Sequence, residues 1–294
     1  MKLAVDIGSN TIKCLLGEFR NGNVEVFYEK SLESRISSGN GLVENAADLI
    51  SEALLYFIEQ SSAISADFSV EAVATSALRD APNSAEICEK VFAKTSVKIK
   101  ILTGIEEAEL SYRGAMSDLA VDANSSNIFF DLGGGSMEVV RGNGGKVISS
   151  ESFPIGAVRM TKRFLSCGVN GKGLSEIKNL ALAEFEKKLE VPNFESLVGA
   201  GGAVAAARIM KRSMDFSTPE NILSASEFKY MLGLISGLSA GGIASKFGIS
   251  ENRAEIIPAA FVCVLALMEF LGSDSLIHTF RNLRYGLIVS DSRV

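Results

Sequence analysis

The sequence predicts an α/β protein built from two copies of one domain, and three observations support this prediction. Apolar strand-like runs alternate with stretches of helical spacing along the chain. The pattern Asp–apolar–Gly–x–x–(Thr/Ser) occurs at residues 6–11 and again at 131–136. A polar stretch at 117–127 separates the two halves. We therefore expect domains over 1–120 and 121–294.

The first half begins with two strands, 2–7 and 12–19, joined by the turn GSNT, and a third strand at 24–33. The apolar spacing over 46–59 predicts a helix, and 70–78 is a strand that leads into a loop. A helix follows from RDAPN (79–83) to about residue 92, and a further strand covers 97–102. The segment 103–116 begins a helix, because Thr103 and Glu106 form the capping-box pattern.

The second half repeats the order of strand, glycine turn and strands, starting from FFDLGGGSMEVV at 129–140. LVGAGGAVAAA at 197–207 predicts a strand, a glycine turn and a helix of small residues. Lys211 and Arg212 end this helix as a basic rim or as solvated residues. The apolar run 256–272 is interpreted as a buried helix, too short for a membrane span. The segment 277–288 either lines a cleft or caps the core.

Composition excludes several classes of protein. The net charge of −6 argues against nucleic-acid binding, and the acidic excess lies within residues 1–120. The four cysteines are far apart and form no CxxC pair, so we interpret them as buried thiols. The first residues run straight into a predicted strand, so we expect no signal peptide and, by default, a cytoplasmic location.

The two turns predict phosphate binding. Their Gly, Ser, Asn and Thr residues expose successive backbone N–H groups, and glycine allows phosphate oxygens to approach closely. An ordinary hairpin turn has similar residues, but the recurrence of the same Asp placement favours the phosphate interpretation. Asp131 and Glu138 flank the second turn, one on each strand. A tight hairpin brings both to one side, where their oxygens suit Mg²⁺.

Two further charged positions predict catalysis. Glu106 fits the capping box, which leaves the adjacent Glu107 free to orient or deprotonate a water. Arg79 lies between a strand end and a helix, where it either clamps a terminal phosphate or pairs with Asp80 or Glu86. The glycine turn at 199–202 either binds a phosphate at a helix N-terminus or serves close packing.

In their order along the chain, VDIGSNTIK, ATSALRDAPN, ILTGIEEAEL, FFDLGGGSMEVV, SFPIGAVRMTKRF, LVGAGG and ENRAEIIPAA resemble the blocks of one family. It is the exopolyphosphatase/guanosine pentaphosphate phosphatase family, of the actin–hexokinase–Hsp70-like superfamily. TGIEEA and SFPIGAVRMTKRF are the more family-specific blocks. The resemblance implies a short form with two actin-like (ribonuclease H-like) domains and a cleft between them.

The resemblance also implies roles for individual residues. Glu107 matches the catalytic glutamate, with Arg79 beside it as a catalytic and phosphate-binding residue. Asp131 and Glu138 match the acids near the metal, and we add Asp6 to this metal set. The remaining phosphate-binding positions are Ser9, Asn10, Thr11, Gly133, Gly134, Gly135, Ser136, Gly201 and Gly202. Ala203 departs from the family pattern, which has a threonine there and so one more hydroxyl.

The expected activity is Mg²⁺-dependent hydrolysis of a terminal phosphoanhydride bond. Inorganic polyphosphate is the favoured substrate and guanosine pentaphosphate the alternative, with no nucleic acid or membrane as partner. A non-catalytic sensor of these ligands and a kinase of the same superfamily also remain open. The presence of Glu107, Asp131 and Glu138 counts against the sensor. The apolar run 256–272 is compatible with a homodimer.

Overall fold

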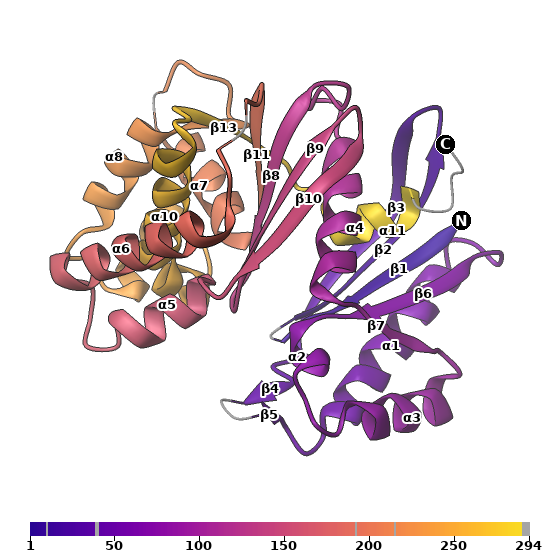
Figure 1. Ribbon diagram of the computed structural model, residues 1–294. Coiled ribbons are helices and arrows are strands. Elements are labelled where there is room, and N and C mark those ends of the chain that lie inside the picture. The colour runs from indigo at the N-terminus through magenta and orange to yellow at the C-terminus, as the bar shows by residue number, and fades with distance from the viewer. Residues whose placement is uncertain (10, 39–40, 192, 215, 290–294) are drawn as a thin grey trace. The chain divides into compact units, whose positions relative to one another are not determined.

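The chain folds into two compact units. The computed structural model describes residues 1–9, 11–38, 41–191, 193–214 and 216–289 (Figure 1). The first unit consists of Met1–Leu119 together with Arg281–Val294, and the second is Ala120–Phe280. The break near residue 120 lies within one residue of the expected boundary.

The first unit is built on a five-stranded sheet in the order β3-β2-β1-β6-β7. The strands β1, β6 and β7 run parallel, whereas β2 is antiparallel to both β1 and β3. The bounds are β1 Lys2–Ile7, β2 Thr11–Arg20, β3 Asn23–Glu33, β6 Ser69–Ala74 and β7 Ile99–Ile101. A separate small ladder pairs β4 Ser37–Ser38 with β5 Gly41–Leu42.

Helices cover both faces of this sheet. Alternate residues of β1 point to opposite sides and therefore pack against different helices. Leu3, Val5 and Ile7 pack in a core with α1 and α3, whereas Ala4 packs in a second core with α11 (Figure 1). The bounds are α1 Ala46–Ser62, α2 Ser76–Arg79, α3 Ser84–Thr95, α4 Gly104–Met116 and α11 Leu283–Val289.

The C-terminal helix α11 corrects the expected domain limits, because 281–294 belongs to the first unit and not to 121–294. The backbone of α11 lies directly against the backbone of α4. A Cβ atom on Gly286 would lie 1.9 Å from the carbonyl oxygen of Leu110. A Cβ atom on Gly114 would lie 2.1 Å from the carbonyl oxygen of Asn282. Over Leu283–Val289, the segment therefore caps the core of the first unit.

The second unit repeats this topology. Its six-stranded sheet has the order β10-β9-β8-β11-β13-β12, in which β8, β11 and β13 run parallel. The first five strands follow the same path as those of the first unit, and β12 adds an antiparallel edge. The bounds are β8 Ser126–Leu132, β9 Met137–Asn143, β10 Lys146–Phe153, β11 Ser196–Ala200, β12 Ile222–Ser224 and β13 Ser275–His278. The duplication inferred from the two turns is thus seen in the strand order.

Five helices described in the second unit pack around a sixth, α10. The bounds are α5 Ala157–Phe164, α6 Gly171–Lys188, α7 Gly202–Arg212, α8 Ala225–Ile235, α9 Ala240–Phe247 and α10 Glu251–Leu271. At 21 residues, α10 is long and apolar enough to cross a membrane, so the expectation that it is too short was wrong. Most of its apolar stretch, 72%, is buried inside the second unit, as a core helix requires.

A buried ion pair joins α7 to α8. The Lys211 ammonium lies 2.9 Å from the Glu227 carboxylate, and their side chains are only 3% and 6% exposed. Lys211 also donates to the hydroxyl of Thr218 and to the carbonyl of Pro219. Burial by itself would raise the pKa of the Glu227 carboxyl, but hydrogen bonds from Lys211, Ser224 N–H and Thr218 lower it overall. Lys211 is therefore part of the core and not a basic rim.

Replacing Glu227 by glutamine is expected to destabilise the protein by about 2 kcal/mol at pH 7, because the buried ammonium loses its counter-charge. The folded pKa of Glu227 lies below its ordinary value of 4.5. The stabilisation is therefore present above pH 4.5 and is lost as the pH falls through the folded value. Urea denaturation of both proteins from pH 7 to pH 3 should show the difference shrinking. Glu220→Gln is the control, since the Glu220 side chain, which pairs with Arg208 and Arg212, is 43% exposed and leaves no deeply buried ammonium unpaired.

Candidate phosphate site

In the first unit, the predicted site residues gather at one edge of the sheet. The parallel strands β1, β6 and β7 all end there. The first turn follows β1, Arg79 ends the short helix after β6, and Glu107 lies in the first turn of α4 after β7. The carboxyl ends of parallel strands are the usual place for ligands in open α/β sheets.

The first turn is closed by a hydrogen bond in which Gly8 N–H donates to the carbonyl of Thr11, at 3.1 Å. Ser9 lies in this turn and Thr11 begins β2, whereas Asn10 lies outside the described residues. Burial raises the pKa of Asp6, against opposing effects of Lys13 and Arg284. Its buried Oδ1 has no hydrogen-bond partner within the described part of the chain. Asp6 thus offers an oxygen that a ligand could use.

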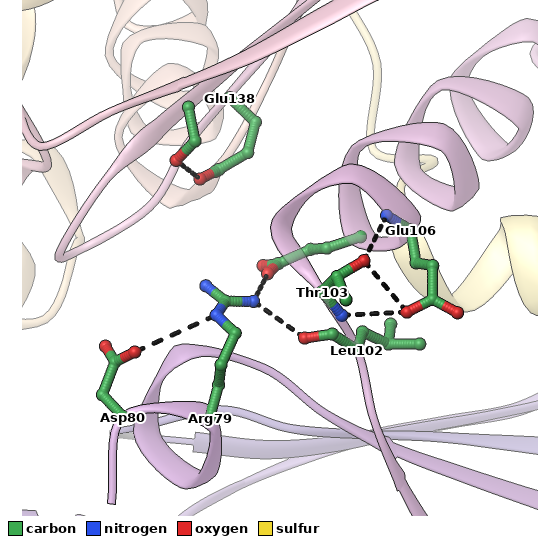
Figure 2. Close-up of polar contacts among 8 residues, drawn as sticks. Arg79, Asp80, Leu102, Thr103, Glu106 and Glu138 are labelled. Carbon is green, nitrogen blue, oxygen red and sulfur yellow. Dashed lines mark hydrogen bonds and ion pairs between the residues drawn. The ribbon is translucent and has the colours of Figure 1, made fainter.

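Arg79 and Glu107 form an ion pair. Nη1 of Arg79 donates to Glu107 Oε2 at 2.9 Å and to the carbonyl of Leu102 at 3.0 Å (Figure 2). Asp80 lies farther away, with its carboxylate 4.0 Å from Arg79 Nε. Glu107 is therefore not the free carboxylate that the sequence suggested, and it is the main partner of Arg79. Both hydrogen bonds use Nη1, and none from Nη2 is formed with the described residues.

Glu106 has the capping role expected of it. The Thr103 hydroxyl accepts from Glu106 N–H, and the Glu106 carboxylate accepts from Thr103 N–H at 2.9 Å (Figure 2). Lys100 also donates to this carboxylate, at 2.7 Å. The hydrogen bond from Lys100, followed by those from Thr103, lowers the pKa of Glu106 to about 2. Glu106 is therefore engaged in the helix cap, as the sequence predicted, and the catalytic role of Glu107 stays a prediction.

The second turn repeats the closure of the first, since Gly133 N–H donates to the carbonyl of Ser136 at 3.0 Å. The start of α5 holds its carbonyl groups. Ala157 N–H donates to the carbonyl of Gly133 at 2.9 Å, and Arg159 N–H to that of Gly134 at 3.0 Å. Among the described residues, nothing accepts from the N–H groups of Gly134 and Gly135. The turn therefore presents donors, as anion binding requires.

Asp131 and Glu138 lie directly opposite each other on β8 and β9. Cross-strand partners project to the same face of a sheet, so the expectation that both acids lie on one side is confirmed. Glu138 is 5% exposed, which rules out a solvated strand residue, and Ser152 Oγ donates to its Oε1 at 2.9 Å.

The glycine turn at 201–202 lies beside Asp131, because β11 pairs with β8 and sets Ala200 opposite Asp131. Gly201 has a φ of 106°, and a Cβ atom on it would lie 2.4 Å from the carbonyl oxygen of Leu132. Arg253 Nη1 donates to the carbonyl of Gly202 at 2.5 Å. Burial lowers the pKa of Arg253. Both turns and both acids of the second unit thus meet at one sheet edge.

The structure tests the predicted metal set only in part. In the described residues, no three or more His, Cys, Asp or Glu side chains are placed to hold a metal ion. The adjacent pair Asp131 and Glu138 still fits Mg²⁺, which commonly takes one or two carboxylates and completes its shell with water and phosphate oxygens. The participation of Asp6 remains a prediction.

Sequence reasoning missed three residues that support the turns. Arg159 Nε donates to the carbonyl of Gly135 at 2.8 Å, Ser152 bonds Glu138, and Arg253 bonds Gly202. Arg159 and Arg253 lie in blocks already singled out, SFPIGAVRMTKRF and ENRAEIIPAA, so a closer view of their basic residues could have suggested them. Ser152 is the first residue of SFPIGAVRMTKRF, but it lies 14 positions from Glu138 and only the pairing of β10 with β9 brings the two together.

The family of this chain follows from comparison with known proteins. The model of the Ppx/GppA phosphatase family matches residues 28–293. The chain belongs to the Ppx/GppA family. A bifunctional 3-dehydroquinate synthase/phosphatase of Fusobacterium nucleatum is 26% identical over 94% of the chain. The chain spans only 44% of the length of that curated relative.

Solved structures confirm the fold of this Ppx/GppA member. The family member from Aquifex aeolicus superposes with a TM-score of 0.85 at 22% identity, covering 98% of this chain and 96% of that one. An exopolyphosphatase from Cytophaga hutchinsonii gives the same TM-score at 20% identity and the same coverage. The predicted family and two-domain fold are therefore confirmed.

Proposed function

We propose that the chain is an exopolyphosphatase, which hydrolyses the terminal phosphoanhydride bond of inorganic polyphosphate with Mg²⁺ and releases orthophosphate. The observation that carries this proposal is the sheet edge of the second unit. Two glycine turns with available N–H donors lie there beside the paired acids Asp131 and Glu138. Donors for phosphate next to ligands for a hard cation are what a phosphoanhydride substrate needs.

In this proposal, the turns bind phosphate and Arg79 clamps the terminal group through its Nη2. Glu107 orients the attacking water, with its carboxylate fixed by the bond from Arg79. Asp131 and Glu138 would hold Mg²⁺, which neutralises phosphate charge when bound. Phosphoryl transfer depends mostly on such positioning and charge neutralisation.

Guanosine pentaphosphate is the alternative substrate, since the same residues would release its terminal phosphate. Phosphate release should therefore be measured with Mg²⁺ and three substrates offered separately: medium-chain polyphosphate, guanosine pentaphosphate and ATP. Release from polyphosphate alone is expected, and release mainly from the pentaphosphate would favour the alternative. Binding without release from any substrate would support a sensor.

We also propose that the protein is cytoplasmic and that it forms a homodimer. Gel filtration with light scattering would test the dimer directly.

Replacing Arg253 by glutamine is expected to raise the KM for polyphosphate about tenfold with little change in kcat. The charged guanidinium of Arg253 donates to the carbonyl of Gly202, and the loss of this hydrogen bond releases the Gly201–Gly202 turn. Steady-state kinetics of phosphate release would measure this. Arg253→Lys should restore part of the affinity, and Arg212→Gln, at the exposed far end of α7, should change neither constant. An unchanged KM in Arg253→Gln would contradict the positioning role.

A further inference from the structure

An open cavity of about 300 Å³ lies at the surface of the second unit, away from the phosphate turns, and Ser149, Lys188 and Glu190 of its lining are exposed. Ile128 and Val139 on the sheet and Leu271 at the end of α10 form its aliphatic floor, and all three are buried. Side chains alternate between the faces of a strand, so Val139 lies on the face opposite to Glu138. The cavity therefore lies on the other face of the sheet from the paired acids.

A β-bulge opens this space. Val147 of β10 pairs with Gly142, but the next pair along the ladder is Ser149 with Arg141. A regular ladder continuing from Val147 would set Ile148 opposite Arg141. The bulge instead pairs the small, exposed Ser149 with Arg141, and both line the cavity, whereas Ile148, which is 54% exposed, does not. A large apolar side chain is thus exchanged for a small polar one at the cavity wall.

Arg141 indicates an acceptor in the ligand. Its Nε is buried and has no hydrogen-bond partner within the described residues. Leaving such a donor unsatisfied costs free energy, so an acceptor brought to this guanidinium, which lines the cavity, would be favoured. A guanidinium presents parallel N–H groups that match a carboxylate in geometry.

The other charges around the cavity indicate a zwitterion. Lys188, at the end of α6, adds a second cation, and Glu151 and Glu190 add two carboxylates. The four charges sum to zero, so the cavity offers no excess that would favour a polyanion. Its volume is at the lower end for ligand sites, too small for a nucleotide with its phosphates.

We propose that this cavity binds a small aliphatic zwitterion, an α-amino acid of about the size of leucine. The carboxylate lies against Arg141, the ammonium toward Glu151 and Glu190, and the aliphatic side chain on the floor formed by Ile128, Val139 and Leu271. This site is separate from the phosphate turns and does not depend on the proposed hydrolase activity.

Isothermal titration calorimetry of the full chain with L-leucine tests the ligand class. Isocaproate, which lacks the ammonium group, and isoamylamine, which lacks the carboxylate, are the matched comparators. We expect L-leucine to bind at least about tenfold more tightly than either. Equal binding of isocaproate or isoamylamine would overturn the zwitterion assignment, and no binding of L-leucine would overturn the site.

Variants test the location. Arg141→Gln removes the carboxylate partner and Ser149→Leu fills the cavity, and each should weaken L-leucine binding at least about tenfold. Lys146→Gln, an exposed change on the same strand outside the cavity, should leave the affinity unchanged. Circular dichroism shows whether each variant is folded. A folded Arg141→Gln or a folded Ser149→Leu protein is sufficient to test the location. Undiminished binding in a folded Arg141→Gln or Ser149→Leu protein would overturn the proposed location.

Discussion

Replacing Glu107 by glutamine should lower the rate of phosphate release by about 10²–10⁴-fold, the range of a positioned acid or base. Glutamine keeps the shape of the side chain and an oxygen that can accept from Arg79. The glutamine amide cannot accept a proton from the attacking water, and it lacks the negative charge with which a carboxylate orients that water. The KM for polyphosphate should therefore change little while kcat falls, which steady-state phosphate release would show.

The neighbouring Glu106→Gln provides a matched control. Glu106 differs by one position on the same helix, and it caps α4 at an exposed site paired with Lys100. Its replacement should lower stability slightly and leave kcat as in the wild type. If Glu107→Gln keeps full turnover, Glu107 acts only as an anchor for Arg79. Arg79→Lys separates these roles further, since it should raise KM by weakening the clamp on phosphate.

Local signals predicted much of the fold and of the candidate site. The Asp–apolar–Gly–x–x–(Thr/Ser) pattern correctly placed two hairpins with the same closing hydrogen bond, because a turn this tight depends only on nearby residues. The capping box likewise correctly placed the start of α4 at Thr103. The facing of Asp131 and Glu138 also followed, since hairpin register is set by the turn between the strands.

Contacts between residues distant in the chain could not be predicted in the same way. The partner of Arg79 is Glu107, 28 positions away, and the sequence suggested only the nearer Asp80 and Glu86. The β-bulge at Ile148 could not be predicted either, because strand-like composition does not show where a strand carries one extra, unpaired residue.

The contact of the C-terminal helix α11 with α4 is also made between segments that are far apart in the sequence. Gly286→Ala should destabilise the first unit by at least about 4 kcal/mol, more than most core changes. The added methyl group would lie 1.9 Å from the carbonyl oxygen of Leu110 and 2.6 Å from its carbon, and backbone cannot rotate away as a side chain can. To accommodate it, α11 must move off α4 and expose Tyr285 and Leu287, now 8% and 1% exposed.

Urea denaturation followed by circular dichroism measures this effect, with Gly233→Ala as the matched control. Gly233 is also inside a helix, α8, but a Cβ atom there meets nothing within 4 Å. Alanine is the better helix former by about 1 kcal/mol, so the control should gain stability, and the same gain opposes the clash at Gly286. A midpoint for Gly286→Ala at or above that of the wild type would therefore mean that the two helices do not touch as closely as described. Because α11 covers only the core of the first unit, the loss should also divide unfolding into two steps, with the second unit melting last.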